Sequence, residues 1–476
     1  MGNRPCTASI HIIDDDSLLH VFYLYRPFLL GEDEDHLARL HGGRRSWVRG
    51  RWWYKLAHVC QRWRSILLGS ASYLGISLVC TYGTPVAEML AHSPPIPLVV
   101  DYAGEESEDP ITAEDEEQLI HALKQRDRVS RVRLYNTKLQ KLIAMDEEYP
   151  VLEYLIILSP NEDNTTILIV PETFQAPHLR HLMLGGFSLP IGCRLLTSAV
   201  GLITLCFIMR HPSTYFHPNT LLQWISFMPQ LGTLVIRFSL PVHKRYVARQ
   251  LMPTPITTLI TLPNLRYFRF DGVSTYSEVL VRQITTPRLE KLEILFFSQL
   301  TFFVPRLHQL MNTAENLRFD SVRFRFSNKG VSVALYLREV ETVALVIDVK
   351  CWHLDWQVSS MVQISNSLGQ VFSAVDHLML GHAVHNHSSE EHNVIDRTEW
   401  RELLRPFNNV KTLWIPKGLV EGLSRCLQLE DGELPLELLP ELQELTFPRN
   451  DNNHDAFTLF INARQNAGRA VTVVRP

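Results

Sequence analysis

The stretch Pro287-Arg288-Leu289-Glu290-Lys291-Leu292-Glu293-Ile294 contains the pattern that decides the fold, Leu-x-x-Leu-x-Ile. The same six-residue phrase begins at Leu152, Leu179, Leu202, Leu231, Leu265, Val375, Val410 and Leu442, with looser copies at Val129, Leu317 and Val340. Subtracting these residue numbers shows that successive copies begin 23 to 35 residues apart. A short apolar phrase repeated at such intervals indicates a chain built from similar structural units.

Leucine-rich repeats carry strand phrases of this kind about every 20–29 residues, and longer insertions fall in loops. Neighbouring strands of stacked repeats would bury positions 1, 4 and 6, while positions 3 and 5 would face solvent. The pattern therefore predicts an α/β fold in which residues 71–476 form an irregular leucine-rich-repeat solenoid with a parallel concave sheet. The alternative is an ordinary α/β domain in which apolar triplets recur by chance, because the periods are irregular and an asparagine ladder is missing.

The composition is that of a folded, water-soluble protein. The 476 residues could form two or three ordinary domains or one long solenoid, and 46% hydrophobic with 20% charged residues is a usual balance. A formal net charge of -4 argues against a dedicated nucleic-acid binder. The uncharged run Leu195 to Met209 has fifteen residues and is shorter than the ~20 needed to span a membrane. We therefore expect no nucleic acid and no membrane among the partners.

The cysteines and the N-terminus predict a cytoplasmic and/or nuclear location. Seven cysteines are scattered along the chain without a C-x-x-C pair, which suits reduced thiols. The acidic run Asp14-Asp15-Asp16 lies where a secretory signal would need an apolar segment.

Residues 10–66 differ from the repeats and predict two helices. Acids and a serine precede Leu18, Leu19 and Phe22, which share one stripe of a first helix. A second helix is expected through residues 52–66, with apolar residues at three-to-four spacing. A block of under 70 residues rarely buries so many large apolar groups by itself, so part of this surface should meet a partner.

The two helical segments resemble the halves of an F-box. The first reads Ile13-x-Asp-Asp-x-Leu-Leu-x-Val-Phe22 and the second Leu56-x-x-Val-Cys-x-x-Trp-Arg64. With the continuations Cys80–Leu90 and Pro97–Tyr102, the whole chain resembles fungal F-box proteins that have a leucine-rich-repeat-like C-terminal region. Asp14 replaces the proline usual in that family, and about thirty residues separate the two halves.

The resemblance implies a substrate-recognition subunit of a Skp–cullin–F-box ubiquitin ligase. Residues 1–70 would be an F-box-like helical module with an insertion at about 24–51, and would bind a Skp-type adaptor and through it the cullin ligase core. The expected adaptor-binding residues are Ile13, Leu18, Leu19, Phe22, Leu56, Val59 and Trp63. One alternative is a leucine-rich-repeat interaction scaffold that is not coupled to a ligase, and another is an enzyme whose site the motifs do not reveal.

Positions 3 and 5 of the strand phrases are the candidates for holding a substrate protein. They would line the concave sheet, which is the usual binding face of such solenoids, and arginine and aromatic residues are favoured at interfaces. The alternative is that these positions accept such residues because of β-propensity alone. The candidates are Arg131, Arg133, Tyr154, His181, Tyr267, Arg269, Lys291 and Trp414.

Catalytic motifs such as G-x-S-x-G, Walker A, H-E-x-x-H and G-x-G-x-x-G are absent, so we expect a non-enzymatic protein without a cofactor. The cluster His377, His382, His385, His387 and His392, beside Glu390 and Glu391, could ligate zinc. It lacks a cysteine partner and lies in a polar insertion, which favours a loop without a metal.

Arginines 44, 45, 49 and 51 alternate with Trp47, Trp52 and Trp53 and superficially suggest nucleic-acid binding. Their place in the F-box insertion of an acidic chain favours a solvated or adaptor-facing role.

Overall fold

The computed structural model describes most of the chain, which divides into two compact units, Met1–Ala199 and Val200–Pro476. The described residues are 13–26, 52–102, 112–135, 145–159, 168–190, 192–211, 214–239, 259–299, 301–302, 304–339, 341–383, 396–430, 432–448 and 456–475. The expected boundary at residue 70 stays a prediction, although the N-terminal helices contact the segment that follows them. The indole N–H of Trp53, for example, donates to the carbonyl oxygen of Ser77 at 3.2 Å.

The first unit begins with helices and continues as a parallel sheet. Its helices are α1 (Asp15–Tyr25), α3 (Trp52–Ala57), α4 (Gln61–Gly69), α5 (Ala71–Leu74), α6 (Val86–Ala91), α7 (Ala113–Leu123) and α8 (Arg194–Ser198). Its strands are β1 (Leu78–Cys80), β2 (Leu98–Tyr102), β3 (Val129–Tyr135), β4 (Tyr154–Leu158), β5 (Leu168–Ile169), β6 (His181–Gly185) and β7 (Phe187–Ser188). Strands β1, β2, β3, β4 and β6 pair in that order, all parallel.

The single helix expected over residues 52–66 is instead two helices. Cys60 has extended backbone angles, φ −161° and ψ 169°, which end the first helix and start the second. Its Sγ accepts the amide of Trp63 at 3.5 Å and so occupies the N-cap position of α4. The apolar spacing runs through both helices, so it does not report the break between them.

The second unit continues the alternation of strands and helices. Its strands are β8 (Thr204–Met209), β9 (Thr233–Phe238), β10 (Ile260–Thr261), β11 (Tyr267–Gly272), β12 (Ile284–Thr285), β13 (Lys291–Phe296), β14 (Ser321–Ser327), β15 (Gly330–Leu337), β16 (Thr342–Val349), β17 (His377–Ala383), β18 (Thr412–Trp414), β19 (Glu444–Thr446) and β20 (Thr472–Val474). Its helices are α9 (Pro218–Ile225), α11 (Ser274–Val281), α12 (Leu307–Thr313), α13 (Leu354–Ser367), α14 (Gly369–Phe372), α15 (Arg397–Leu404), η6 (Lys417–Leu419), α16 (Val420–Leu427) and α17 (Thr458–Asn466).

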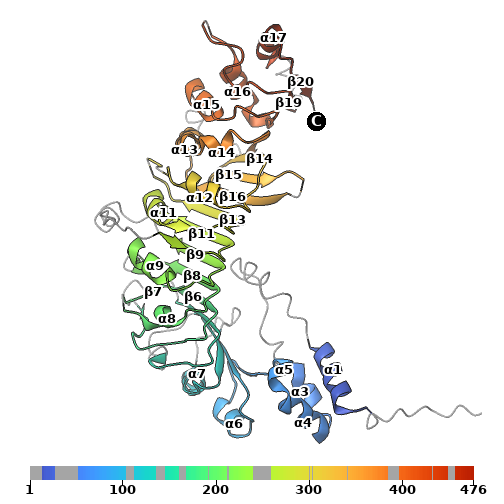
Figure 1. Cartoon of the computed structure of the whole chain (residues 1–476), viewed down its shortest axis with the longest axis vertical. Helices are drawn as coiled ribbons and strands as arrows, with labels where there is room; N and C mark the ends of the chain where they lie inside the picture. Colours follow the sequence, from blue (N-terminus) through green and yellow to red (C-terminus); the bar gives the residue numbers. More distant parts are fainter. Residues whose placement is uncertain are drawn as a thin grey trace, which may run out of the picture. The chain divides into compact units, whose positions relative to one another are not determined.

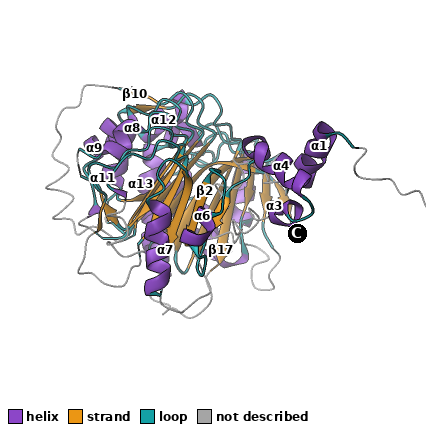
Figure 2. Ribbon diagram, turned by 90° about the horizontal axis from the view of Figure 1, so that it is seen from below, coloured by secondary structure: helices purple, strands orange, loops and turns teal. Residues whose placement is uncertain are grey.

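The repeated phrase is the strand of this sheet, as the sequence predicts. In β11 and β13, Phe268 pairs with Leu292 and Phe270 with Ile294, so positions 4 and 6 of neighbouring phrases lie side by side. All four side chains are buried, which stabilises the unit by about 1.5–3 kcal/mol for each. Helices α9, α11 and α13 lie along one side of these strands (Figures 1 and 2). The apolar core of the unit lies between the two layers.

One part of the sheet is not parallel, which corrects the prediction that the whole sheet is parallel. Strand β15 pairs antiparallel with both β14 and β16, and β14 and β16 then pair parallel with β17 and β13. The two loose phrases of this region are also out of register. Val322, rather than the expected Asp320, occupies position 4 beside Leu378, and Leu345, rather than Val343, occupies it beside Leu292.

The structure is therefore a mixed α/β fold with a large, mostly parallel sheet. None of the helices in the described ranges has the length and the apolar content that a membrane span requires.

The turn between β14 and β15 requires a glycine. Gly330 has φ +155°, and a Cβ at this position would overlap the carbonyl oxygen of Val349 on β16. We expect Gly330→Ala to lower the free energy of unfolding by about 1–3 kcal/mol, because the strand must shift or strain. Urea titration followed by circular dichroism measures this. The matched control is Gly369→Ala at the start of α14, where a Cβ meets nothing within 4 Å. Equal stability of the two variants would contradict the prediction.

Helix α11 contains a carboxylic acid with a pH-dependent effect on stability. Both oxygens of Glu278 accept the backbone amide of Arg306, at 3.1 and 3.2 Å. Burial raises the pKa of Glu278 to about 7, and the hydrogen bond from Arg306 only partly offsets it. The folded-state pKa of Glu278 lies above the ordinary 4.5. Its contribution to the free energy of unfolding is therefore fully present below pH ~4.5 and is lost as the pH rises towards 7.

Glu278→Gln should remove the loss of stability at higher pH. The glutamine side chain stays neutral and keeps an oxygen that accepts the backbone amide of Arg306. We expect the difference in melting temperature between wild type and Glu278→Gln to grow in favour of the variant from about pH 5 to pH 8. Glu315→Gln, at an exposed position, is the control and should follow the wild type. A constant difference across this range would contradict the assignment.

Candidate protein-binding surfaces

Asp14 starts the first N-terminal helix. Its Oδ1 accepts the backbone amide of Ser17 at 2.7 Å and its Oδ2 accepts the Ser17 hydroxyl at 2.9 Å. These hydrogen bonds lower the pKa of Asp14 below its ordinary value, the backbone bond most. The residue that departs from the F-box pattern is therefore a side-chain N-cap, which satisfies a free amide of α1.

Helices α1 and α4 close a small core of their own. Leu18 and Phe22 of α1 are each only 1% exposed, and the Phe22 ring meets the Trp63 ring edge-on at 5.0 Å. Arg62 of α4 joins the start of α1 by donating to the carboxylate of Asp15 at 2.8 Å and to the carbonyl of Ile13 at 2.6 Å. The two segments that are far apart in the sequence are thus held together by apolar and polar contacts.

Packing of α1 against α4 divides the seven expected adaptor-binding residues into three groups. Leu18 and Phe22 are buried in the core between the two helices, and their role in adaptor binding stays a prediction. Leu19, Leu56 and Trp63 are half-buried, whereas Ile13 and Val59 are exposed.

Sequence reasoning missed a second set of apolar residues on α1. Val21, Leu24 and Tyr25 are 51%, 63% and 58% exposed. They lie on the side of the helix next to the buried stripe. The sequence could have revealed them, because α1 carries apolar residues on more than one side. An exposed apolar face of this kind is a common site of protein–protein contact.

The expected substrate-binding residues lie on one face of each sheet. In the first unit, strand register aligns Arg131 with Tyr154 and Tyr154 with His181, whose rings are 5.7 Å apart. Arg133 donates to both carboxylate oxygens of the buried Asp101, at 2.8 and 2.7 Å. This face therefore holds arginine and aromatic side chains in fixed positions.

In the second unit, Arg269 is the centre of a charged network. Its guanidinium contacts Asp271 at 3.0 Å and Glu293 at 3.1 Å. Arg237 binds the other oxygen of Asp271 at 2.8 Å, and Lys291 binds Glu293 at 2.7 Å. The sequence did not single out Asp271, Glu293 or Arg237, although Glu293 is position 5 of the phrase that decides the fold.

The ionisation of this network follows from burial and pairing. Burial opposes the charge of Glu293, but hydrogen bonds from Lys291 and Tyr267 outweigh it and lower its pKa. Burial also opposes the charge of Arg269, and the hydrogen bonds and charge of Asp271 raise its pKa above the ordinary value. Asp348 has the opposite balance: burial raises its pKa, against a hydrogen bond from Ser332 on the neighbouring strand.

Several positions expected to face solvent are buried. Tyr154 and Tyr267 are nearly inaccessible, and the position-5 residues Cys206 and Val235 are completely so. Register aligns Cys206 with Val235 and Val235 with Arg269, so the three side chains lie on the same face. Arg131, Arg133, His181, Arg269, Lys291 and Trp414 are half-buried and remain accessible in part.

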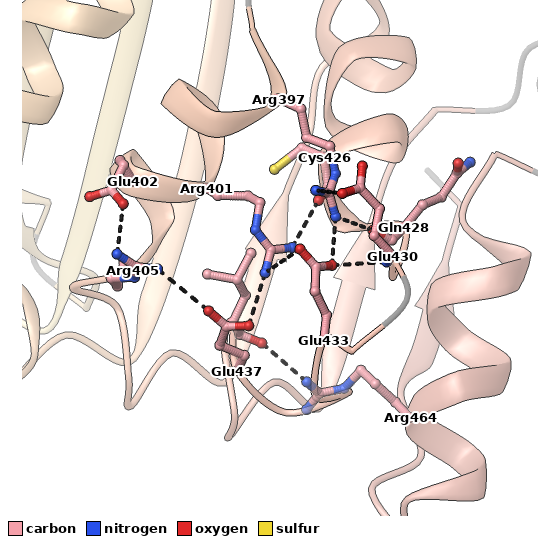
Figure 3. A network of polar contacts seen from close by, with 11 residues as sticks. Arg397, Arg401, Glu402, Arg405, Cys426, Gln428, Glu430, Glu433, Glu437 and Arg464 are labelled. Atoms are coloured by element: carbon pink, nitrogen blue, oxygen red, sulfur yellow. Dashed lines mark hydrogen bonds and ion pairs between the residues drawn. The ribbon is translucent and has the colours of Figure 1, made fainter.

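A second charged network holds the segment after α16 against α15 (Figure 3). Arg397 contacts Glu433 at 2.6 Å and Glu430 at 3.0 Å, and Arg401 contacts Glu433 at 3.3 Å and Glu437 at 3.1 Å. Nearby, the buried Arg464 donates to the carbonyls of Leu438, Pro440 and Leu442. These contacts position backbone, and we assign them a structural role.

Of the histidine cluster, His377 and His382 are described, while His385, His387 and His392, with Glu390 and Glu391, lie outside the described residues. Nδ1 of His377 is 2.8 Å from the Thr412 hydroxyl, and burial followed by the charge of Arg338 lowers its pKa. Burial also lowers the pKa of His382. Across the described ranges, three or more histidine, cysteine, aspartate or glutamate residues nowhere gather as a metal site.

Trp53, from the stretch that superficially suggested nucleic-acid binding, is a core residue, and Trp52 is half-buried. Residues 44–51 of that stretch lie outside the described residues.

No protein-family model matches this sequence, and a search of the curated proteins also finds no match.

The Arg269 network predicts a measurable loss of stability. Arg269→Met leaves Asp271 and Glu293, both largely buried, with only Arg237 and Lys291 to offset their charges. Breaking a buried ion pair costs about 3–5 kcal/mol. We expect Arg269→Met to lower the free energy of unfolding by about 2–3 kcal/mol, because those two cations remain. Urea titration is the measurement. Arg266→Met is the control, because the 3.9 Å contact of Arg266 with Glu290 is mostly exposed. This variant should lower the free energy of unfolding by less than about 0.5 kcal/mol. Equal losses in the two variants would contradict the assigned role.

Proposed function

We propose that this protein is a non-enzymatic substrate-recognition subunit of a Skp–cullin–F-box ubiquitin ligase. In this proposal, the N-terminal helices are an F-box module that binds a Skp-type adaptor. The strands and helices that follow are an irregular leucine-rich-repeat solenoid whose sheet face holds a substrate protein. Such a receptor acts by proximity, because it raises the effective concentration of the substrate near the conjugating enzyme.

The observation that carries the adaptor proposal is the unused apolar surface of α1. The core between α1 and α4 takes up Leu18 and Phe22, yet Val21, Leu24 and Tyr25 stay exposed beside it. A helix that has already closed its own core and still presents three large apolar side chains is suited to a partner's helices. The resemblance to the two halves of an F-box supports a Skp-type adaptor as that partner.

The sheet face supports the substrate proposal. Arg269 and Lys291 are held by Asp271 and Glu293, so little side-chain entropy is lost when a partner binds them. The same face would also serve an interaction scaffold without a ligase. Binding of the adaptor is what distinguishes the two functions.

We further propose that the complex works in the cytoplasm or the nucleus. Each cysteine among the described residues is free, as in proteins of a reducing compartment.

The test is capture of a Skp-type adaptor by the purified full chain. We expect the wild type to bind and Val21→Asp/Leu24→Asp to lose at least about thirtyfold in affinity, because a desolvated carboxylate replaces an apolar anchor. Leu459→Asp on α17 is the matched control, since Leu459 is 65% exposed in the other unit. Circular dichroism confirms that each variant is folded. A folded wild-type chain that captures no adaptor would overturn the ligase proposal in favour of the scaffold.

A further inference from the structure

Two tryptophans of the second unit are exposed on its helical side. Trp352 is 76% exposed in the segment between β16 and α13, and Trp356 is 57% exposed in the first turn of α13. They lie on either side of the helix N-cap His353, whose ring meets the Trp356 ring edge-on at 5.2 Å. Tryptophan is highly buried on average, and two such exposed rings in five residues are characteristic of a contact surface.

Acidic residues lie at the start of α13 and at the start of the neighbouring helix α15. Asp355 precedes Trp356 in the first turn of α13, and its carboxylate accepts the backbone amide of Trp356 at 2.8 Å. Helix α15 packs on α13 and carries Asp396 at its N-cap and Glu399 in its first turn. Burial and then the charges of Asp355 and Asp396 raise the pKa of Glu399.

The neighbouring cations are engaged elsewhere. The Arg397 guanidinium, which follows Asp396 in the chain, contacts Glu430 and Glu433 on the other side of α15. The ammonium of Lys350 lies over the Phe297 ring, 5.5 Å from its centre. The patch of Trp352, Asp355, Trp356, Asp396 and Glu399 thus combines aromatic faces with negative charge that those two cations do not neutralise.

We propose that this patch is a docking surface for an arginine-bearing segment of a partner protein. A guanidinium stacks on an indole face and binds carboxylates through two parallel hydrogen bonds, so it satisfies both features together. A lysine ammonium supplies the charge but not the planar stacking. The patch shares no residue with the sheet-face candidates or with the N-terminal helices, so the inference does not depend on adaptor binding.

The experiment uses the full chain and three fluorescently labelled nonapeptides, of arginine, lysine and glutamate, with fluorescence anisotropy as the readout. We expect the arginine peptide to bind most tightly, the lysine peptide several-fold more weakly, and the glutamate peptide not to bind. Trp352→Ala/Trp356→Ala should lower the affinity for the arginine peptide about tenfold, as the loss of two cation–π contacts implies. Asp355→Asn/Glu399→Gln should lower the affinity for both basic peptides and reduce the dependence of that affinity on salt concentration.

Two control variants separate this patch from nonspecific attraction. Leu459→Ala removes an equally exposed apolar side chain from α17, and Glu339→Gln removes an exposed carboxylate near β15; neither should change the affinity. The melting temperature of every variant confirms that it is folded. Equal binding of the arginine peptide to the wild type and the double tryptophan variant, or no binding to the wild type, would overturn the proposal.

Discussion

Residues at the same position of successive phrases lie beside each other in the parallel strands of each unit. Leu292 and Ile294 pair with Phe268 and Phe270 on one side and with Leu345 and Ile347 on the other. A slip of one residue would turn every apolar side chain of a strand towards the opposite face, so burial strongly favours this register. The positions of the helices, of the charged face and of the exposed residues all follow from it.

Register also explains why charges gather on the face opposite the core. Side chains two residues apart on a strand, and those aligned on the next strand, are close neighbours. Arg269 therefore meets Asp271 on its own strand and Glu293 on the next, and Arg237 meets Asp271 from the other side. Glu293, in contact with Arg269 and Lys291, has a lowered pKa although burial opposes its charge, whereas burial raises the pKa of Asp348 against a hydrogen bond from Ser332.

The N-terminal helices α1 and α4 are held together by side-chain contacts and not by a sheet. A short core of Leu18, Phe22 and Trp63 and the contacts of Arg62 with Asp15 and Ile13 join α1 to α4. Such a small core cannot cover all the apolar side chains of α1. Val21 and Leu24 are left on the surface as a consequence, and there they can contribute to binding.

The sequence by itself determined the strand phrases, the alternation of strands and helices and the two stripes of the N-terminal helices, because local periodicity reflects which side of an element is buried. Only the tertiary structure decided the antiparallel insertion of β15, the break at Cys60, and which apolar and charged residues are accessible. Leu18 and Val21 look alike in the sequence, and so do Tyr267 and Trp414; their exposure depends on distant segments that pack on them. Periodicity describes one element at a time, whereas accessibility and ion pairing are properties of several elements in contact.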